Sequence, residues 1–94
     1  MAEIYVIADN GPNGRYIRNA ATTERHAREL AEMVTDEYVM TGYPAPSVQT
    51  IPYAEKTQAE AEQVPALLTV YHLRKSATAW VNVEVYRIRE RIEQ

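Results

Sequence analysis

The sequence contains no cysteine. A disulfide scaffold, a thiolate zinc site, an iron–sulfur cluster and a cysteine nucleophile are therefore excluded. Long apolar runs are also missing: the stretch from Ile4 to Ala8 is too short for a signal peptide or a membrane span. We therefore expect a cytoplasmic protein that makes no contact with a membrane.

An excess of positive charge is absent as well. Thirteen acidic residues stand against ten basic ones, which gives a formal net charge of −3 at pH 7. Proteins that bind duplex nucleic acid usually carry the opposite sign, because much of their affinity comes from neutralised phosphates. The charge balance therefore disfavours a nucleic-acid partner, although a local basic patch would still be compatible with it.

Phenylalanine is missing too, so the aromatic residues are seven tyrosines and one tryptophan. Eight of the ten basic residues are arginine. Tyrosine, tryptophan and arginine are the residues enriched at binding hot spots. A GC-rich coding genome would produce the same bias, and composition alone does not separate the two explanations.

Alternation with a period of two predicts a hairpin at the start of the chain. Glu3 to Ala8 forms the first strand and Arg15 to Asn19 the second. The run between them, Asp9 to Gly14, contains two Asn-Gly pairs, which favour a tight turn. A strand–turn–strand reading explains Gly11 and Gly14 better than a phosphate loop, which would need a helix directly after the glycines.

A long helix is predicted after the hairpin. Thr22 or Thr23 is suited to cap it, and Gly42 is suited to end it before Pro44. Five residues at helical spacing form its apolar face. They are Ala27, Leu30, Ala31, Val34 and Tyr38.

Three further strands are predicted at Ser47–Tyr53, Ala66–Arg74 and Ala79–Tyr86. Between the first two of these, Gln58 to Gln63 follows a capping-box pattern and is either a short helix or an acidic loop.

The tail from Arg87 to Gln94 is compatible with a strand or a helix. As a strand it would place Arg87, Arg89 and Arg91 in line with the valines of the preceding strand. Because a cationic row does not share a buried face, we expect the strand to run past the sheet edge, or a bulge or helical turn to intervene.

The element order β-β-α-β-(α)-β-β predicts that residues 1–94 form a single α+β domain. Its simplest architecture is an antiparallel sheet of about five strands with one long helix packed on one face. The expected core is mainly aliphatic: Ile4, Val6, Leu30, Ala31, Val34, Tyr38, Val48, Leu68, Val70, Val81, Val83 and Val85. The opposite sheet face would then be aromatic and carry Tyr5, Tyr71, Trp80 and Tyr86.

No set of residues indicates catalysis or a cofactor. Histidine, serine and aspartate are present, but no nucleophile-elbow spacing accompanies them. His26 and Glu29 lie three residues apart on the helix, yet two ligands do not make a metal site. We therefore expect no enzyme activity, no metal and no cofactor.

Protein binding is the function that these absences favour. An aromatic sheet face, an arginine-rich tail and free sheet edges are the components of an interface. We select six candidate contact residues: Tyr71, Arg74, Trp80, Tyr86, Arg87 and Arg89. A homodimer that pairs its free strand edges would be one form of such contact.

A nucleic-acid-binding module is the alternative. Ile4-Tyr5-Val6-Ile7 resembles the first aromatic-bearing strand of RNA-recognition motifs, but the companion basic-glycine-aromatic octamer is missing. In this alternative, an arginine-rich edge around Arg74 and Arg87 and the aromatic sheet face would hold the nucleic acid.

The overall pattern resembles small phage and mobile-element proteins, including some anti-CRISPR proteins. The residues that carry the resemblance are the opening strand Ile4-Tyr5-Val6-Ile7, the alanine-rich helix from Ala27 to Met33, and a strand meander that ends near Trp80. The Ala54–Gln63 insertion and the arginine-rich tail depart from it. The resemblance implies a stoichiometric inhibitor of a bacterial host or defence complex, acting by surface contact in the host cytoplasm.

Overall fold

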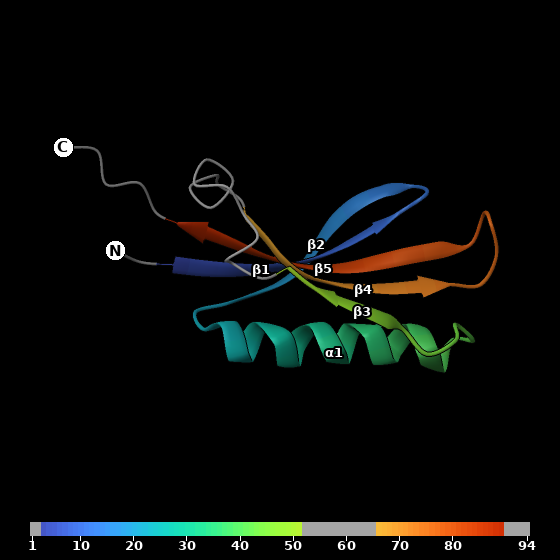
Figure 1. Cartoon of the computed structure of the whole chain (residues 1–94), viewed down its shortest axis with the longest axis horizontal. Helices are drawn as coiled ribbons and strands as arrows, with labels where there is room; N and C mark the ends of the chain where they lie inside the picture. Colours follow the sequence, from blue (N-terminus) through green and yellow to red (C-terminus); the bar gives the residue numbers. More distant parts are fainter. Residues whose placement is uncertain (1–2, 52–65, 90–94) are drawn as a thin grey trace.

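The computed structural model describes residues 3–51 and 66–89, which form one helix and five strands (Figure 1). Their bounds are β1 (Glu3–Gly11), β2 (Gly14–Ala21), α1 (Glu24–Met40), β3 (Ser47–Thr50), β4 (Ala66–Arg74) and β5 (Trp80–Arg89). The strands make a single antiparallel sheet, and α1 packs across one of its faces. The expected α+β fold is confirmed; the expected helix at Gln58–Gln63 lies outside the described residues.

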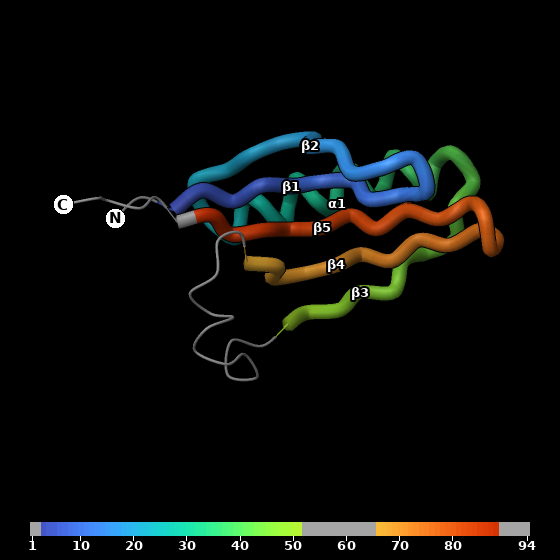
Figure 2. The backbone as a smooth tube through the Cα atoms, turned by 90° about the horizontal axis from the view of Figure 1, so that it is seen from above, coloured from blue at the N-terminus to red at the C-terminus, as the bar shows by residue number. Residues whose placement is uncertain are grey.

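The strand order across the sheet is β2-β1-β5-β4-β3, so the first and last strands lie side by side near its centre (Figure 2). The β1–β5 register runs without interruption from Glu3 opposite Arg89 to Asn10 opposite Asn82. The β1–β2 turn ends at Gly14, whose φ of +119° is a conformation that favours glycine. The hairpin that the Asn-Gly pairs predicted is therefore present.

Helix α1 begins and ends where its capping residues predict. The Thr23 side chain accepts a hydrogen bond from the His26 N–H at 3.2 Å, which caps the first turn. At the other end Gly42, with φ +110°, turns the chain out of the helix. The predicted apolar face of the helix is the one that packs on the sheet, since Ala27, Ala31 and Val34 are buried there.

The face of β1 that packs under the helix is the opposite of the one expected. Ile7 is fully buried, whereas Ile4 is 46% exposed. The register is the reason: Ile7 lies opposite Val85, which faces the helix, and Val6 lies opposite Tyr86, which does not. The assignment of Ile4 and Val6 to the core under the helix was therefore wrong.

Three other core assignments also change. Val48 is exposed, because β3 is a short strand at the sheet edge. Leu68 is the extra residue of a bulge in β4, and this bulge changes the alternation that the sequence pattern assumed. Val70 beyond the bulge is buried but lies opposite Glu84, on the face away from α1.

The first arginine of the tail, Arg87, does share the valine face. β5 pairs with β1 without a bulge through Arg89, so Arg87 lies in line with Val85 and is half-buried. The expectation that a bulge or sheet edge must intervene was wrong at this position. Arg87 lies opposite Tyr5, and its charge lowers the pKa of that tyrosine, whereas burial and the Glu3 carboxylate raise it.

Candidate functional site

The six candidate contact residues do not form one surface. Arg74 and Trp80 are direct cross-strand partners, and Tyr86 lies farther along β5 on the same face, away from α1. Tyr71 is only 6% exposed, because its position opposite Val83 places it beneath the helix. Arg87 lies on the helix side, and Arg89 ends β5 with a side chain outside the described part of the structure.

The expected aromatic face divides between the two sides of the sheet for the same reason. Tyr5 and Tyr71 pack against the core under α1, and only Trp80 and Tyr86 remain on the other side. No helix or strand of residues 3–51 and 66–89 packs on that side (Figure 1), and we call it the uncovered face, although Ala8, Val70 and Glu84 within it are buried. An extended platform of four aromatic rings for stacking bases is therefore absent from the described sheet.

One end of the uncovered face is a polar hollow next to the β4–β5 turn. The hollow has a volume of about 400 Å³ and is lined by His72, Leu73, Arg74, Ala77, Trp80 and Asn82. His72 lies across it, with Nδ1 3.0 Å from the Asn82 side-chain oxygen and Nε2 3.3 Å from that of Gln49. Two of the predicted contact residues, Arg74 and Trp80, thus lie in one hollow.

The other end of the uncovered face is an apolar hollow of about 190 Å³. Three strands line it: Val6 and Ala8 from β1, Arg15 and Ile17 from β2, and Tyr86 and Ile88 from β5. Ile17 is 75% exposed, an unusual degree for a large aliphatic side chain on a sheet face. The sequence pattern missed this hollow because it placed Val6 in the core under the helix.

Arg15 closes one side of the apolar hollow. Its Nε donates to Glu84 Oε1 at 2.9 Å, and its guanidinium lies 5.8 Å from the centre of the Tyr86 ring. Ala8 lies between the strands that carry this pair and has only a methyl group, which leaves room for the arginine. Burial and the hydrogen bond to Glu84 raise the pKa of Tyr86. The ring and cation are therefore already engaged within the fold.

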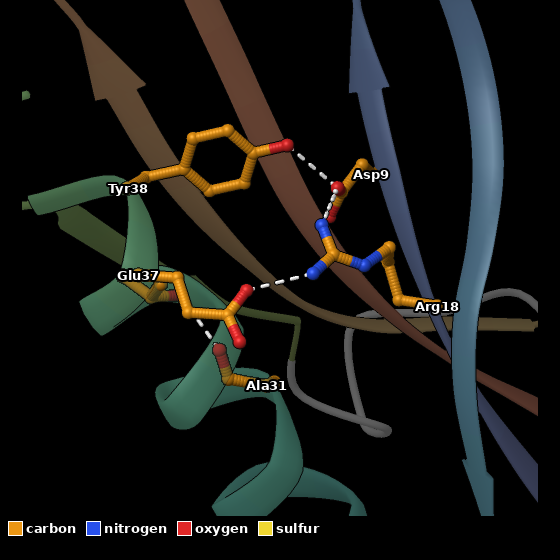
Figure 3. Close-up of polar contacts among 6 residues, drawn as sticks. Asp9, Arg18, Ala31, Glu37 and Tyr38 are labelled. Atoms are coloured by element: carbon orange, nitrogen blue, oxygen red, sulfur yellow. Dashed lines mark hydrogen bonds and ion pairs between the residues drawn. The ribbon is translucent and has the colours of Figure 1, made fainter. Parts of the chain in front are cut away.

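A second polar cluster lies on the helix side, at the hairpin end of the sheet. Asp9 is buried, and its Oδ2 accepts hydrogen bonds from the Tyr38 hydroxyl at 2.6 Å and from Arg18 at 2.7 Å. Arg18 also donates to Glu37 at 2.7 Å, so one guanidinium joins β1, β2 and α1 (Figure 3). The bulge in β2 makes this possible, since Arg18 is the extra residue between Ile17 and Asn19.

The electrostatics of this cluster follow from its burial. Burial, together with the hydrogen bond to Asp9, raises the pKa of Tyr38 to about 12, so its hydroxyl stays a donor at neutral pH. The hydrogen bond from Arg18 to Asp9 likewise raises the pKa of the guanidinium. Sequence reasoning missed the cluster because its members come from three elements and because Asp9 lay in a run of turn-forming residues.

Next to Asp9 and Tyr38, at the hairpin end of the sheet, lies a cavity of about 180 Å³. The residues that line it come from the β1–β2 hairpin, from the C-terminal end of α1 and the segment after it, and from the start of β5. They are Asp9, Gly11, Pro12, Asn13, Gly14, Tyr16, Tyr38, Tyr43, Trp80 and Val81. Tyr38 and Tyr43 meet edge to face, with ring centres 5.5 Å apart. The cavity therefore joins a buried carboxylate to three tyrosine side chains.

Within residues 3–51 and 66–89, no group of three or more His, Asp or Glu residues is placed to hold a metal ion. In the same part of the chain, no helix has the length and apolar character needed to cross a membrane. Comparison of the chain with protein-family models, with curated proteins and with solved structures gave no match.

Proposed function

We propose that this protein is a non-enzymatic binding protein that contacts a protein partner through the uncovered face. The observation that supports this most directly is the apolar hollow, together with the exposure of Ile4 and Ile17 beside it. Exposed apolar patches on soluble domains often mark interaction sites, because burying them against a partner is favourable.

The hollow indicates the chemistry of the partner. Among the described residues that line it, Arg15 is the only one with a charged side chain. Arg15 is already paired with Glu84, so this surface offers apolar contact rather than a free charge. A partner with aliphatic or aromatic side chains fits this surface better than a phosphate backbone does. Arg74 and Trp80 at the polar hollow would lie at the polar rim of such an interface.

The resemblance to anti-CRISPR proteins makes a bacterial defence complex the first partner to test. In this form of the proposal the protein is a stoichiometric inhibitor that blocks a surface and performs no chemistry.

The test is affinity capture from nuclease-treated bacterial lysate with matched variants. Ile17→Gln changes the most exposed residue of the apolar hollow, and Met33→Gln makes the same replacement on the exposed surface of α1. Both residues are largely exposed, so we expect both variants to fold. A stoichiometric protein that is captured by the unaltered chain and by Met33→Gln, but lost with Ile17→Gln, would support the proposal.

Two outcomes would contradict it. Capture that is equal for the two variants would remove the uncovered face as the interface. A signal that disappears on nuclease treatment and falls steeply between low and high salt would instead favour the nucleic-acid alternative.

A further inference from the structure

The cavity on the helix side contains a buried hydrogen-bond acceptor without a donor. Both donors to Asp9, from Arg18 and Tyr38, reach the same oxygen, Oδ2 (Figure 3). The second oxygen, Oδ1, is covered and has no hydrogen-bond partner among the described residues. A buried carboxylate oxygen without a donor costs free energy, so it indicates a group that the fold alone does not supply.

The charge around the cavity favours a cation. Among the described residues that line the cavity, Asp9 is the only one with a charged side chain, and its ion-pair partner Arg18 is shared with the exposed Glu37. The C-terminal end of α1 also borders the cavity through Tyr38, and its last turn contains no basic residue. The partial negative charge of that helix end therefore adds to the attraction for a cation.

The walls of the cavity are of the kind that accept an organic cation. Tyr16, Tyr38 and Tyr43 line it, and tyrosine rings attract ammonium groups through their π faces. The fold already uses this attraction once, since the Lys75 ammonium lies 4.8 Å from the centre of the Tyr43 ring. Lys75 is not among the residues that line the cavity, which leaves the remaining tyrosine surfaces for a ligand.

We propose that this cavity binds an ammonium group that has at least one N–H, such as a lysine side chain or a small alkylamine. The N–H would donate to Asp9 Oδ1, and the tyrosines would surround the attached carbons. Because Oδ1 is covered in the unbound fold, a neighbouring side chain must move aside for the N–H to reach it. A volume of about 180 Å³ is small for a complete metabolite and suits a head group. Tyr16 is the most exposed aromatic wall, held by one hydrogen bond from its hydroxyl to Asn13 at 3.2 Å, and we infer that the ligand enters beside it.

This site lies on the helix side and does not rest on the proposed function of the uncovered face. Either proposal can fail without the other.

The experiment is an NMR titration with n-butylammonium chloride at constant ionic strength. The chain has only three glycines, and two of them, Gly11 and Gly14, line the cavity, whereas Gly42 does not. We expect saturable shifts of the Gly11 and Gly14 amide signals, with a roughly millimolar dissociation constant because so few atoms are buried. n-Butanol, which has the same shape without the charge, should give no saturable shift.

Two further probes test the chemistry and the source of the cation. Tetramethylammonium has a charge but no N–H, and we expect it to bind at least tenfold more weakly than n-butylammonium. A short neutral peptide with one central lysine is compared with its acetyl-lysine form. Tighter binding of the lysine peptide than of n-butylammonium identifies a protein side chain as the ligand, and weaker binding identifies a free amine.

Variants complete the test. Asp9→Asn removes the charge and should weaken n-butylammonium binding at least tenfold. This change also removes partners of Arg18 and Tyr38, so a pair of variants at Tyr16 is made that leaves the ion-pair cluster intact. Tyr16→Leu removes an aromatic ring from the cavity lining and should weaken binding several-fold. Tyr16→Phe keeps the ring and should leave binding unchanged. The proposal is overturned if n-butylammonium gives no shift, if n-butanol or tetramethylammonium binds equally well, or if Tyr16→Leu and Tyr16→Phe bind alike.

Discussion

Asp9 shows how one residue can organise the interior of a small domain. Its carboxylate lies in the row of β1 that faces the helix, two residues from the fully buried Ile7. A charge at such a position is tolerated only when it is paired and hydrogen-bonded. Arg18 and Tyr38 supply that pairing from β2 and α1, so Asp9 fixes the position of both elements.

Tyr38→Phe tests this role at the residue scale. The change removes the 2.6 Å hydrogen bond to Asp9 and keeps the ring, so we expect it to lower the free energy of unfolding by about 2 kcal/mol at pH 7. Urea denaturation measures the loss. Tyr16→Phe is the matched control: its hydroxyl bonds the exposed Asn13 carbonyl, and we expect a change within about 0.5 kcal/mol.

The same variant gives a pH signature. The pKa of Tyr38 is about 12 in the folded chain against 10.0 for the unperturbed side chain, so the fold favours the protonated form. The stability from this difference is complete below pH 10 and is lost as the pH rises toward 12. The difference in free energy of unfolding between the unaltered chain and Tyr38→Phe should therefore become smaller above pH 10. If this difference stays constant up to pH 11.5, the protonated Tyr38 hydroxyl does not stabilise the fold in the way proposed.

At the scale of elements, local sequence patterns predicted which helix and strands form, whereas contacts between distant segments determine how these elements are arranged. The strand at Ala66–Arg74 has the predicted bounds, and the helix has the predicted cap at Thr23 and the predicted buried face. Such features depend on residues within a few positions of one another. The bulge at Arg18 does not, because it appears only when β2 is set against β1.

The Arg18 bulge joins three elements, and Arg18→Met measures what that junction contributes. Methionine keeps the aliphatic stem but breaks the ion pairs with Asp9 and Glu37, and it leaves the Asp9 carboxylate with one donor. We expect a loss of about 2–3 kcal/mol in the free energy of unfolding. The control is Arg25→Met on α1, where a 92% exposed side chain pairs at 3.6 Å and the change should stay within about 0.5 kcal/mol. Equal losses for the two variants would contradict a structural role for the bulge.

At the scale of the whole molecule, the sequence predicted the layers but not which face of β1 lies between them. Both faces of β1 are apolar, Ile4 and Val6 on one and Tyr5 and Ile7 on the other, so alternation alone does not select the buried one. The choice depends on the pairing of β1 with β5, whose partners lie about eighty residues apart in the chain. The same choice moved Val6 and Ala8 to the uncovered face and created the apolar hollow proposed as an interface.

Ile4 and Ile7 provide a direct test of this arrangement, because they have the same side chain on the same strand. Ile7 is fully buried against α1 and Ile4 is 46% exposed. We expect Ile7→Ala to cost about 3 kcal/mol, from lost burial and the cavity left behind, and Ile4→Ala to cost less than about 1 kcal/mol. Urea denaturation of the two variants under identical conditions measures both. A larger loss for Ile4→Ala would mean that α1 covers the opposite face, and that Val6 and Ala8 belong to the core while Tyr5 and Tyr71 are available to a partner.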